Sequence, residues 1–221
     1  MDFMNEVDRR EAIIKHLNRM ATSGKINKLS KGKYFKPQDT VFGTLLPDQY
    51  QIVKDLLEED GKPVGYITGY SVYNLLGFTT QVSNTIQIGK REIRPSFKRG
   101  RFRISFIKQK NTINKENIPL LQILDAIRYI KKIPDTTIDK SCIRLMVLLR
   151  ELKTSEQIKL IKLAFKYSPA TRALLGALLK EIGCKVENEI RDLKDTLNPI
   201  TVYNIGISEK LLLNAKYWNI I

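Results

Sequence analysis

Apolar residues recur with a helical period near the start of the chain. Ile13, Leu17 and Met20 are spaced at i, i+4 and i+7, and cations occupy many of the remaining positions. This spacing predicts an amphipathic helix over residues 8–20 with a basic outer face. Gly24 follows closely, and a glycine at this place is suited to end a helix.

Two short runs of β-forming residues come next, and they flank the turn Ser30-Lys31-Gly32. Such a pattern predicts a hairpin. A helix followed by a basic hairpin is the second half of a winged helix-turn-helix, in which one helix enters the major groove and the wing contacts the DNA backbone. The side chains predicted to contact DNA are Arg9, Arg10, Lys15, Asn18, Arg19, Lys28, Lys31 and Lys33.

A composition change near Gly61 predicts a domain boundary. Before it, we expect a winged-helix-like DNA-binding region, 1–61, made of a recognition helix (8–20), a wing (25–36) and a connecting helix (49–59). After it, we expect a second domain, 62–221, with a basic antiparallel sheet at 64–108 and a helical part at 119–221. The predicted fold class is therefore α+β.

Charge is distributed unevenly along this chain. The formal net charge is +15 and the pI is about 9.7, which favours a polyanionic partner such as nucleic acid. Predicted strands in the second domain carry one cluster, and a solvated basic face without a ligand is the alternative interpretation. The cations of this predicted nucleic-acid or antitoxicity surface are Lys90, Arg91, Arg94, Lys98, Arg99, Arg101 and Arg103.

Catalytic and cofactor motifs are not found in the sequence. His16 is the single histidine, and no glycine–lysine pair belongs to a phosphate-binding loop motif. Acids between Glu187 and Asp195 alternate with cations, which is typical of a solvated helix and not of a metal site. We therefore expect no enzyme activity, no cofactor and no metal. Because no apolar run approaches membrane-spanning length and no signal peptide is recognisable, we expect a cytoplasmic protein without a membrane partner.

The C-terminal part carries a recognisable order of elements. Ser168 and Pro169 suit the start of a helix whose apolar stripe continues to Gly183. Leu197-Asn198-Pro199 and Trp218-Asn219-Ile220 follow. In order and spacing, these elements resemble the AbiEi family, the antitoxins of type IV toxin–antitoxin systems, which act in abortive infection and phage defence. The matching motif residues are Arg172, Asn198 and Trp218.

The resemblance implies an antitoxin that counters a nucleotidyltransferase-type toxin without forming a stable complex and represses its own operon by binding operator DNA. RNA such as tRNA is a further candidate partner for the basic sheet. AbiEi-like proteins normally have a longer segment before the recognition helix, so the N-terminus is expected to be shortened here. The alternative function is a stand-alone winged-helix regulator with a C-terminal dimerisation or sensing domain.

Arg172 raises a separate question, because a cation one turn from a helix N-terminus is electrostatically disfavoured. Two interpretations stay open at this point. Either a carboxylate inside the fold, such as Asp192 or Asp195, pairs with the guanidinium, or Arg172 binds a phosphate.

Overall fold

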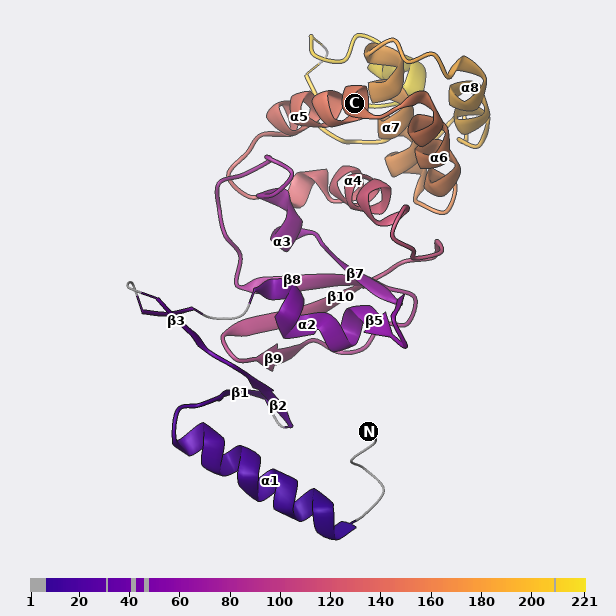
Figure 1. Cartoon of the computed structure of the whole chain (residues 1–221). Coiled ribbons are helices and arrows are strands. Elements are labelled where there is room, and N and C mark those ends of the chain that lie inside the picture. Colours follow the sequence, from indigo (N-terminus) through magenta and orange to yellow (C-terminus); the bar gives the residue numbers. More distant parts are fainter. Residues whose placement is uncertain (1–6, 31, 41–42, 46–47, 209) are drawn as a thin grey trace.

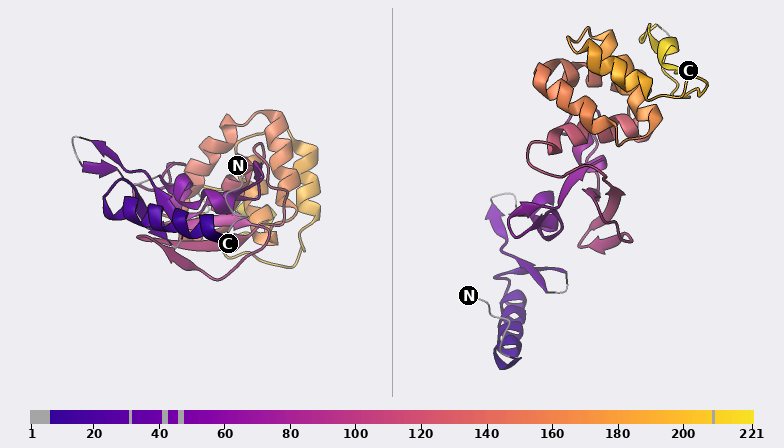
Figure 2. Two further views of the ribbon diagram at one scale, coloured as in Figure 1. Left: turned by 60° about the horizontal axis from the view of Figure 1, so that its bottom comes forward. Right: turned by 90° about the vertical axis from the view of Figure 1, so that its right-hand side faces the viewer.

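The computed structural model describes residues 7–30, 32–40, 43–45, 48–208 and 210–221. Helices and strands both contribute, which confirms the predicted α+β class. The chain is extended from end to end: α1 (Val7–Thr22) lies at one extremity, a four-stranded sheet lies in the middle and most of the helices lie at the other extremity (Figures 1 and 2).

The N-terminal elements follow the predicted order. After α1, β1 (Asn27–Ser30) and β2 (Lys33–Phe35) pair as an antiparallel hairpin. A second hairpin, formed by β3 (Gln38–Thr40) and β4 (Gly43–Leu45), was not predicted. Its strands are only three residues long and lack the apolar alternation by which a sequence reveals a strand.

A four-stranded sheet forms the centre of the molecule, in the order β7-β8-β10-β9. The four strands are β7 (Gly65–Thr68), β8 (Thr85–Lys90), β9 (Phe97–Arg99) and β10 (Phe102–Lys108). The prediction of an antiparallel sheet is wrong for one pair, since β8 and β10 run parallel. The other two pairs are antiparallel.

Residues 91–96, which lie inside the region predicted as sheet, form no regular structure, and β9 begins only at Phe97. Pro95 accounts for part of this difference. Proline has no backbone N–H. It therefore cannot occupy a position inside a sheet at which the N–H must donate to a neighbouring strand. The chain instead uses these residues to return from the end of β8 to the start of β9.

One face of the sheet is covered by α2 (Gln49–Leu57) (Figure 1). Asp48 caps this helix by accepting a hydrogen bond from the Gln51 N–H at 2.7 Å. Ile52 and Val53 of the helix pack in one buried cluster with Ile86 and Ile104 of the sheet. The domain boundary near Gly61 stays a prediction, but this packing groups α2 with the sheet. The two-residue strands β5 (Glu58–Glu59) and β6 (Lys62–Pro63) form the next hairpin.

The opposite face of the sheet is joined to the helical part by a buried carboxyl group. Asp125 is fully buried and accepts hydrogen bonds from Tyr66 Oη (2.7 Å), Thr68 Oγ1 (2.8 Å) and Tyr167 Oη (2.9 Å). Gly89, the neighbour of Tyr66 across β7 and β8, makes room for the ring: a Cβ there would lie 2.4 Å from two ring carbons. The glycine therefore permits the geometry of this network.

The helical part consists of α4 to α8, with the short helix α3 (Tyr70–Tyr73) between sheet and helices. Central among them is α7, which contacts α4, α5, α6 and α8 and is buried on most sides. Ser168 caps α7 as predicted, by accepting from the Thr171 N–H. The bounds are α4 Ile118–Arg128, α5 Ile138–Glu151, α6 Thr154–Ala164, α7 Pro169–Glu181 and α8 Glu187–Asp195, with 3-10 turns at Ile130–Lys132 and Ala215–Trp218.

Trp218 inserts its ring against the backbone of α7. The side chain is fully buried, and a Cβ on Gly176 would lie 2.1 Å from the ring carbon Cη2. The strand-like segment at Tyr203 pairs with Ile220 and holds the end of the chain in place. Gly176 is thus a notch in α7 that receives Trp218.

Replacing Gly176 by Ala should test this notch. In an open helix, Gly to Ala raises stability by about 1 kcal/mol, whereas overpacking here should lower the free energy of unfolding by about 1 to 3 kcal/mol. Urea denaturation measures the change. The double variant Gly176→Ala/Trp218→Leu should lose less stability than the sum of the losses in the two single variants. A Gly176→Ala variant as stable as the wild type would contradict the proposed packing.

Candidate nucleic-acid interface

The predicted recognition helix presents its polar side chains to solvent. Its apolar residues Ile13, Leu17 and Met20 are only half-buried. All predicted DNA-contacting residues of α1 are exposed, namely Arg9, Arg10, Lys15, Asn18 and Arg19.

A side-chain hydrogen bond connects the hairpin to the helix. Tyr34 Oη on β2 donates to Asn18 Oδ1 at 3.1 Å, so Asn18 helps to orient the hairpin on α1. Lys28 on β1 is exposed. Lys31 lies outside the described residues.

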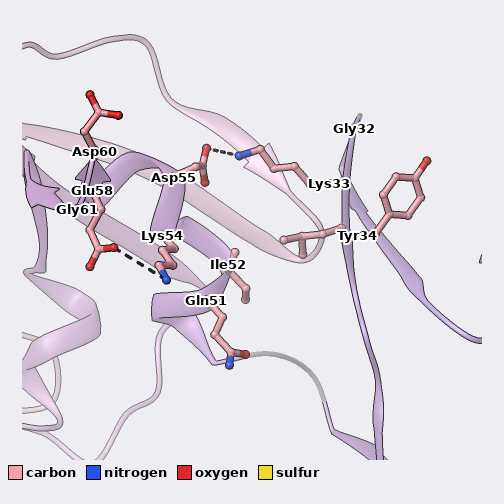
Figure 3. A pocket seen from close by; sticks show the side chains of 11 residues that line it. Gly32, Lys33, Tyr34, Gln51, Ile52, Lys54, Asp55, Glu58, Asp60 and Gly61 are labelled. Atoms are coloured by element: carbon pink, nitrogen blue, oxygen red, sulfur yellow. Dashed lines mark ion pairs between the residues drawn. The ribbon is translucent and has the colours of Figure 1, made fainter. Parts of the chain in front are cut away.

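Lys33 faces the body of the protein, unlike Lys28. Its ammonium group forms an ion pair with Asp55 on α2 (Figure 3). Arg99 reaches the same carboxylate, with Nη1 to Oδ1 at 2.6 Å and Nη2 to Oδ2 at 3.2 Å, and Nη1 also donates to the Ile52 carbonyl oxygen at 2.7 Å. Asp55 thus joins a residue of the hairpin to a residue of β9.

A mixed-charge pocket of about 580 Å³ lies at this junction, between the hairpin, α2 and the turn at Asp60 and Gly61 (Figure 3). Burial acts to raise the pKa of Asp55, but hydrogen bonds from Arg99 and Lys33 outweigh it and hold that pKa below its ordinary value. The carboxylate is therefore kept ionised by its two partners.

The basic surface on the sheet is smaller than the sequence suggested. Arg99 is only 5% exposed, so its inclusion among the nucleic-acid contacts needs correction: it is committed to Asp55. The alternation of residues along β9 did not reveal this, because the partner is 44 positions away. Lys90 is half-buried, with Nζ 3.5 Å from the Leu56 carbonyl oxygen. The exposed members are Arg91, Arg94, Lys98, Arg101 and Arg103.

Aromatic rings accompany these exposed cations. The Arg94 guanidinium lies over Phe97 and Phe106, 4.8 and 5.2 Å from the ring centroids. Arg101 lies 5.0 Å from the Phe102 ring centroid. Cation–π contacts of this kind hold a guanidinium flat on the surface, and Arg94 would have to move before a base could stack on Phe97.

Of the three family-motif residues, Trp218 and Asn198 contribute to the packing of the C-terminal segment. Trp218 fills the notch at Gly176. Asn198 is exposed, its Oδ1 accepts from the Ile200 N–H at 2.9 Å, and its carbonyl oxygen lies 3.4 Å from Asn219 Nδ2.

Arg172 is half-buried, and its Nε is buried without a hydrogen-bond partner. The internal carboxylate interpretation is not seen: Asp192 and Asp195 are exposed on α8, and no ion pair joins either to Arg172. The phosphate interpretation remains a hypothesis.

Possible metal ligands and the two thiols lie in the described part of the chain. It contains no group of three or more His, Cys, Asp and Glu side chains that could hold a metal ion. Cys142 and Cys184 are free thiols, and burial raises the pKa of Cys142 to about 12. Within the same residues, no helix is both long and apolar enough to cross a membrane.

Comparison with known proteins places the chain in a family. The model of DUF6088, a family of unknown function, matches residues 1–158. The chain belongs to DUF6088. No curated protein and no solved structure matches it. The DUF6088 match includes α1, the hairpin and the basic sheet, whereas Arg172, Asn198 and Trp218 lie beyond it.

Asp55→Asn should weaken the junction between hairpin and sheet. Because it leaves the buried Arg99 without a carboxylate, we expect the free energy of unfolding at pH 7 to fall by about 1 to 3 kcal/mol, toward the lower end since Asp55 is partly exposed to solvent. The folded-state pKa of Asp55 is lowered. The stabilisation by Asp55 is therefore complete above the unfolded-state pKa of about 4. It is lost as the pH falls through the lower folded-state pKa.

Denaturation at several pH values measures this effect, with Glu59→Gln as the matched control. Glu59 is exposed, and it forms no ion pair within the described residues. Equal stability of the two variants at pH 7 would show that Asp55 does not hold the junction.

Proposed function

We propose that this chain is an AbiEi-like type IV antitoxin that also represses its own operon. The observation that carries the proposal is the basic unit formed by α1 and the hairpin β1–β2, a helix and a wing that both carry exposed cations. The resemblance of the C-terminal elements around Arg172, Asn198 and Trp218 to that family supports the antitoxin part.

Operator DNA is the proposed partner of the N-terminal unit. Arg10 and Lys15 on α1 are exposed, as cations that contact DNA must be, and Lys28 adds a wing contact to the phosphate backbone. Lys33 is left out of this set because it pairs with Asp55. That pair attaches the hairpin to α2.

The exposed cations of the sheet form the proposed antitoxicity surface. Arg101 and Arg103 lie beyond the DNA-contacting unit and point to solvent. Phosphate contacts to an RNA such as tRNA would give affinity without a stable complex with the nucleotidyltransferase-type toxin. In this proposal the protein is cytoplasmic, uses no cofactor and is not an enzyme.

A stand-alone transcriptional regulator is the second candidate, and one pocket favours it. A cavity of about 820 Å³ lies between α2, β7, α3 and the start of α4, and its lining includes Leu57, Ile67, Val72 and Ile118. Mostly apolar cavities of this size are typical of small-molecule sites. A regulator could use it to sense a ligand.

Co-expression with the gene encoded beside it separates the candidates. The antitoxin proposal predicts that the wild-type chain restores growth when the neighbouring toxin is induced. Arg101→Ser combined with Arg103→Ser should abolish this rescue, because phosphate contacts are lost. Operator affinity should stay within a few-fold of the wild-type value. A wild-type chain that gives no rescue would favour the regulator.

The reciprocal control is Arg10→Ser combined with Lys28→Ser, which removes the same number of charges. It should preserve rescue, weaken operator binding and reduce the salt dependence by about one unit of slope per lost phosphate contact. If rescue and operator binding fell together in both double variants, the division into two surfaces would be wrong.

A further inference from the structure

A basic pocket lies where β10 and α4 end and α7 begins. Its volume is about 370 Å³. Four exposed cations surround it: Lys108 at the end of β10, Lys110 just after it, Arg128 at the end of α4 and Lys166 ahead of α7. These cations come from three separate segments of the sequence, so the fold assembles this cluster.

Among the residues that the structure describes, no carboxylate lines this pocket. Elsewhere in the described residues, carboxylates accompany cations in pockets: Asp55 accompanies Lys33, and Glu58 accompanies Lys54. The four cations here form no ion pair within the described part of the chain. Like charges that line one pocket repel one another unless an anion lies between them.

The floor of the pocket is fixed by buried hydrogen bonds. Gln109 and Tyr167 line it and are both buried, and Gln109 Nε2 donates to the hydroxyls of Tyr66 and Tyr167, each at 2.8 Å. Tyr167 in turn donates to Asp125. The floor is therefore preorganised, as a binding site requires.

Asp125 lies beneath this floor and could in principle repel an anion. It does not line the pocket, and its carboxyl oxygens are occupied by three hydroxyl groups. Burial raises its pKa, which favours the neutral form. The start of α7 on the opposite wall adds the partial positive charge of a helix N-terminus.

We propose that this pocket binds a phosphorylated ligand of nucleotide size. Lysine and arginine side chains bind phosphate oxygens by charge-assisted hydrogen bonds, and four of them suit more than one phosphate group. The volume lies near the lower end of the range for small-molecule sites, so it accommodates a nucleotide and not a length of duplex. This site is separate from the two surfaces of the proposed function and does not depend on them.

Two sources share this chemistry: a free nucleotide, and the terminal phosphate of an RNA strand. Calorimetric titration of the full chain with pyrophosphate, with GTP and with a short RNA bearing a 5′-triphosphate distinguishes them, and the same RNA with a 5′-hydroxyl is the reference. Binding of pyrophosphate and GTP assigns the pocket to free nucleotides. Binding of the triphosphorylated RNA alone assigns it to an RNA terminus.

Lys166→Glu should weaken binding of the ligand identified by about tenfold or more, because an attractive contact becomes repulsive. Lys162→Glu is the matched control: Lys162 is an exposed lysine near the end of α6 and does not line the pocket. Lys110→Glu provides a second pocket variant if Lys166→Glu melts at a lower temperature. Absence of binding to all probes, or equal losses in the Lys162 and pocket variants, would overturn the proposal.

Discussion

The buried carboxyl group of Asp125 holds the sheet and the helical part together. Tyr66 and Thr68 come from β7, and Tyr167 comes from the turn before α7, so three hydroxyls from two distant segments converge on one helix residue. A buried carboxyl without such partners would cost several kcal/mol. Removing one donor leaves part of that cost uncompensated, so the geometry is tightly constrained. Gly89 belongs to this constraint because it admits the Tyr66 ring.

The attachment of the N-terminal unit is different in kind. Lys33, Arg99 and Asp55 form a polar junction at a partly exposed position, and Tyr34 links the hairpin to α1. Interactions of this kind are individually weaker than a buried core. A DNA-contacting unit attached in this way can adjust to its operator while the sheet and helices remain unchanged, which suits a protein proposed to use two surfaces independently.

Local signals allowed much of the fold to be predicted. The apolar spacing of α1, the turn at Gly32 and the Ser168-Pro169 start of α7 are each encoded within a few residues. Long-range pairing was not predictable in this way. The parallel register of β8 and β10 depends on residues well separated in the sequence, and alternation along a strand does not indicate the direction of its neighbour.

The candidate site shows the same limit. Exposure of Lys15 and Lys28 followed from helical phase and the hairpin pattern, but the burial of Arg99 required knowledge of its partner Asp55. Nothing in the sequence around Asp55 indicates that it pairs with Arg99. The nucleotide-sized pocket could not be predicted either, since Arg128 at the end of α4 and Lys166 in the turn before α7 are far apart in the sequence.

Hydrogen–deuterium exchange with and without operator DNA tests the central claim most directly, because it reports protection along the whole chain. The account predicts that operator DNA increases protection in α1 and β1–β2 and leaves β8 and β10 unchanged. Protection gained in β10 or in residues 91–103, with none in α1, would contradict it.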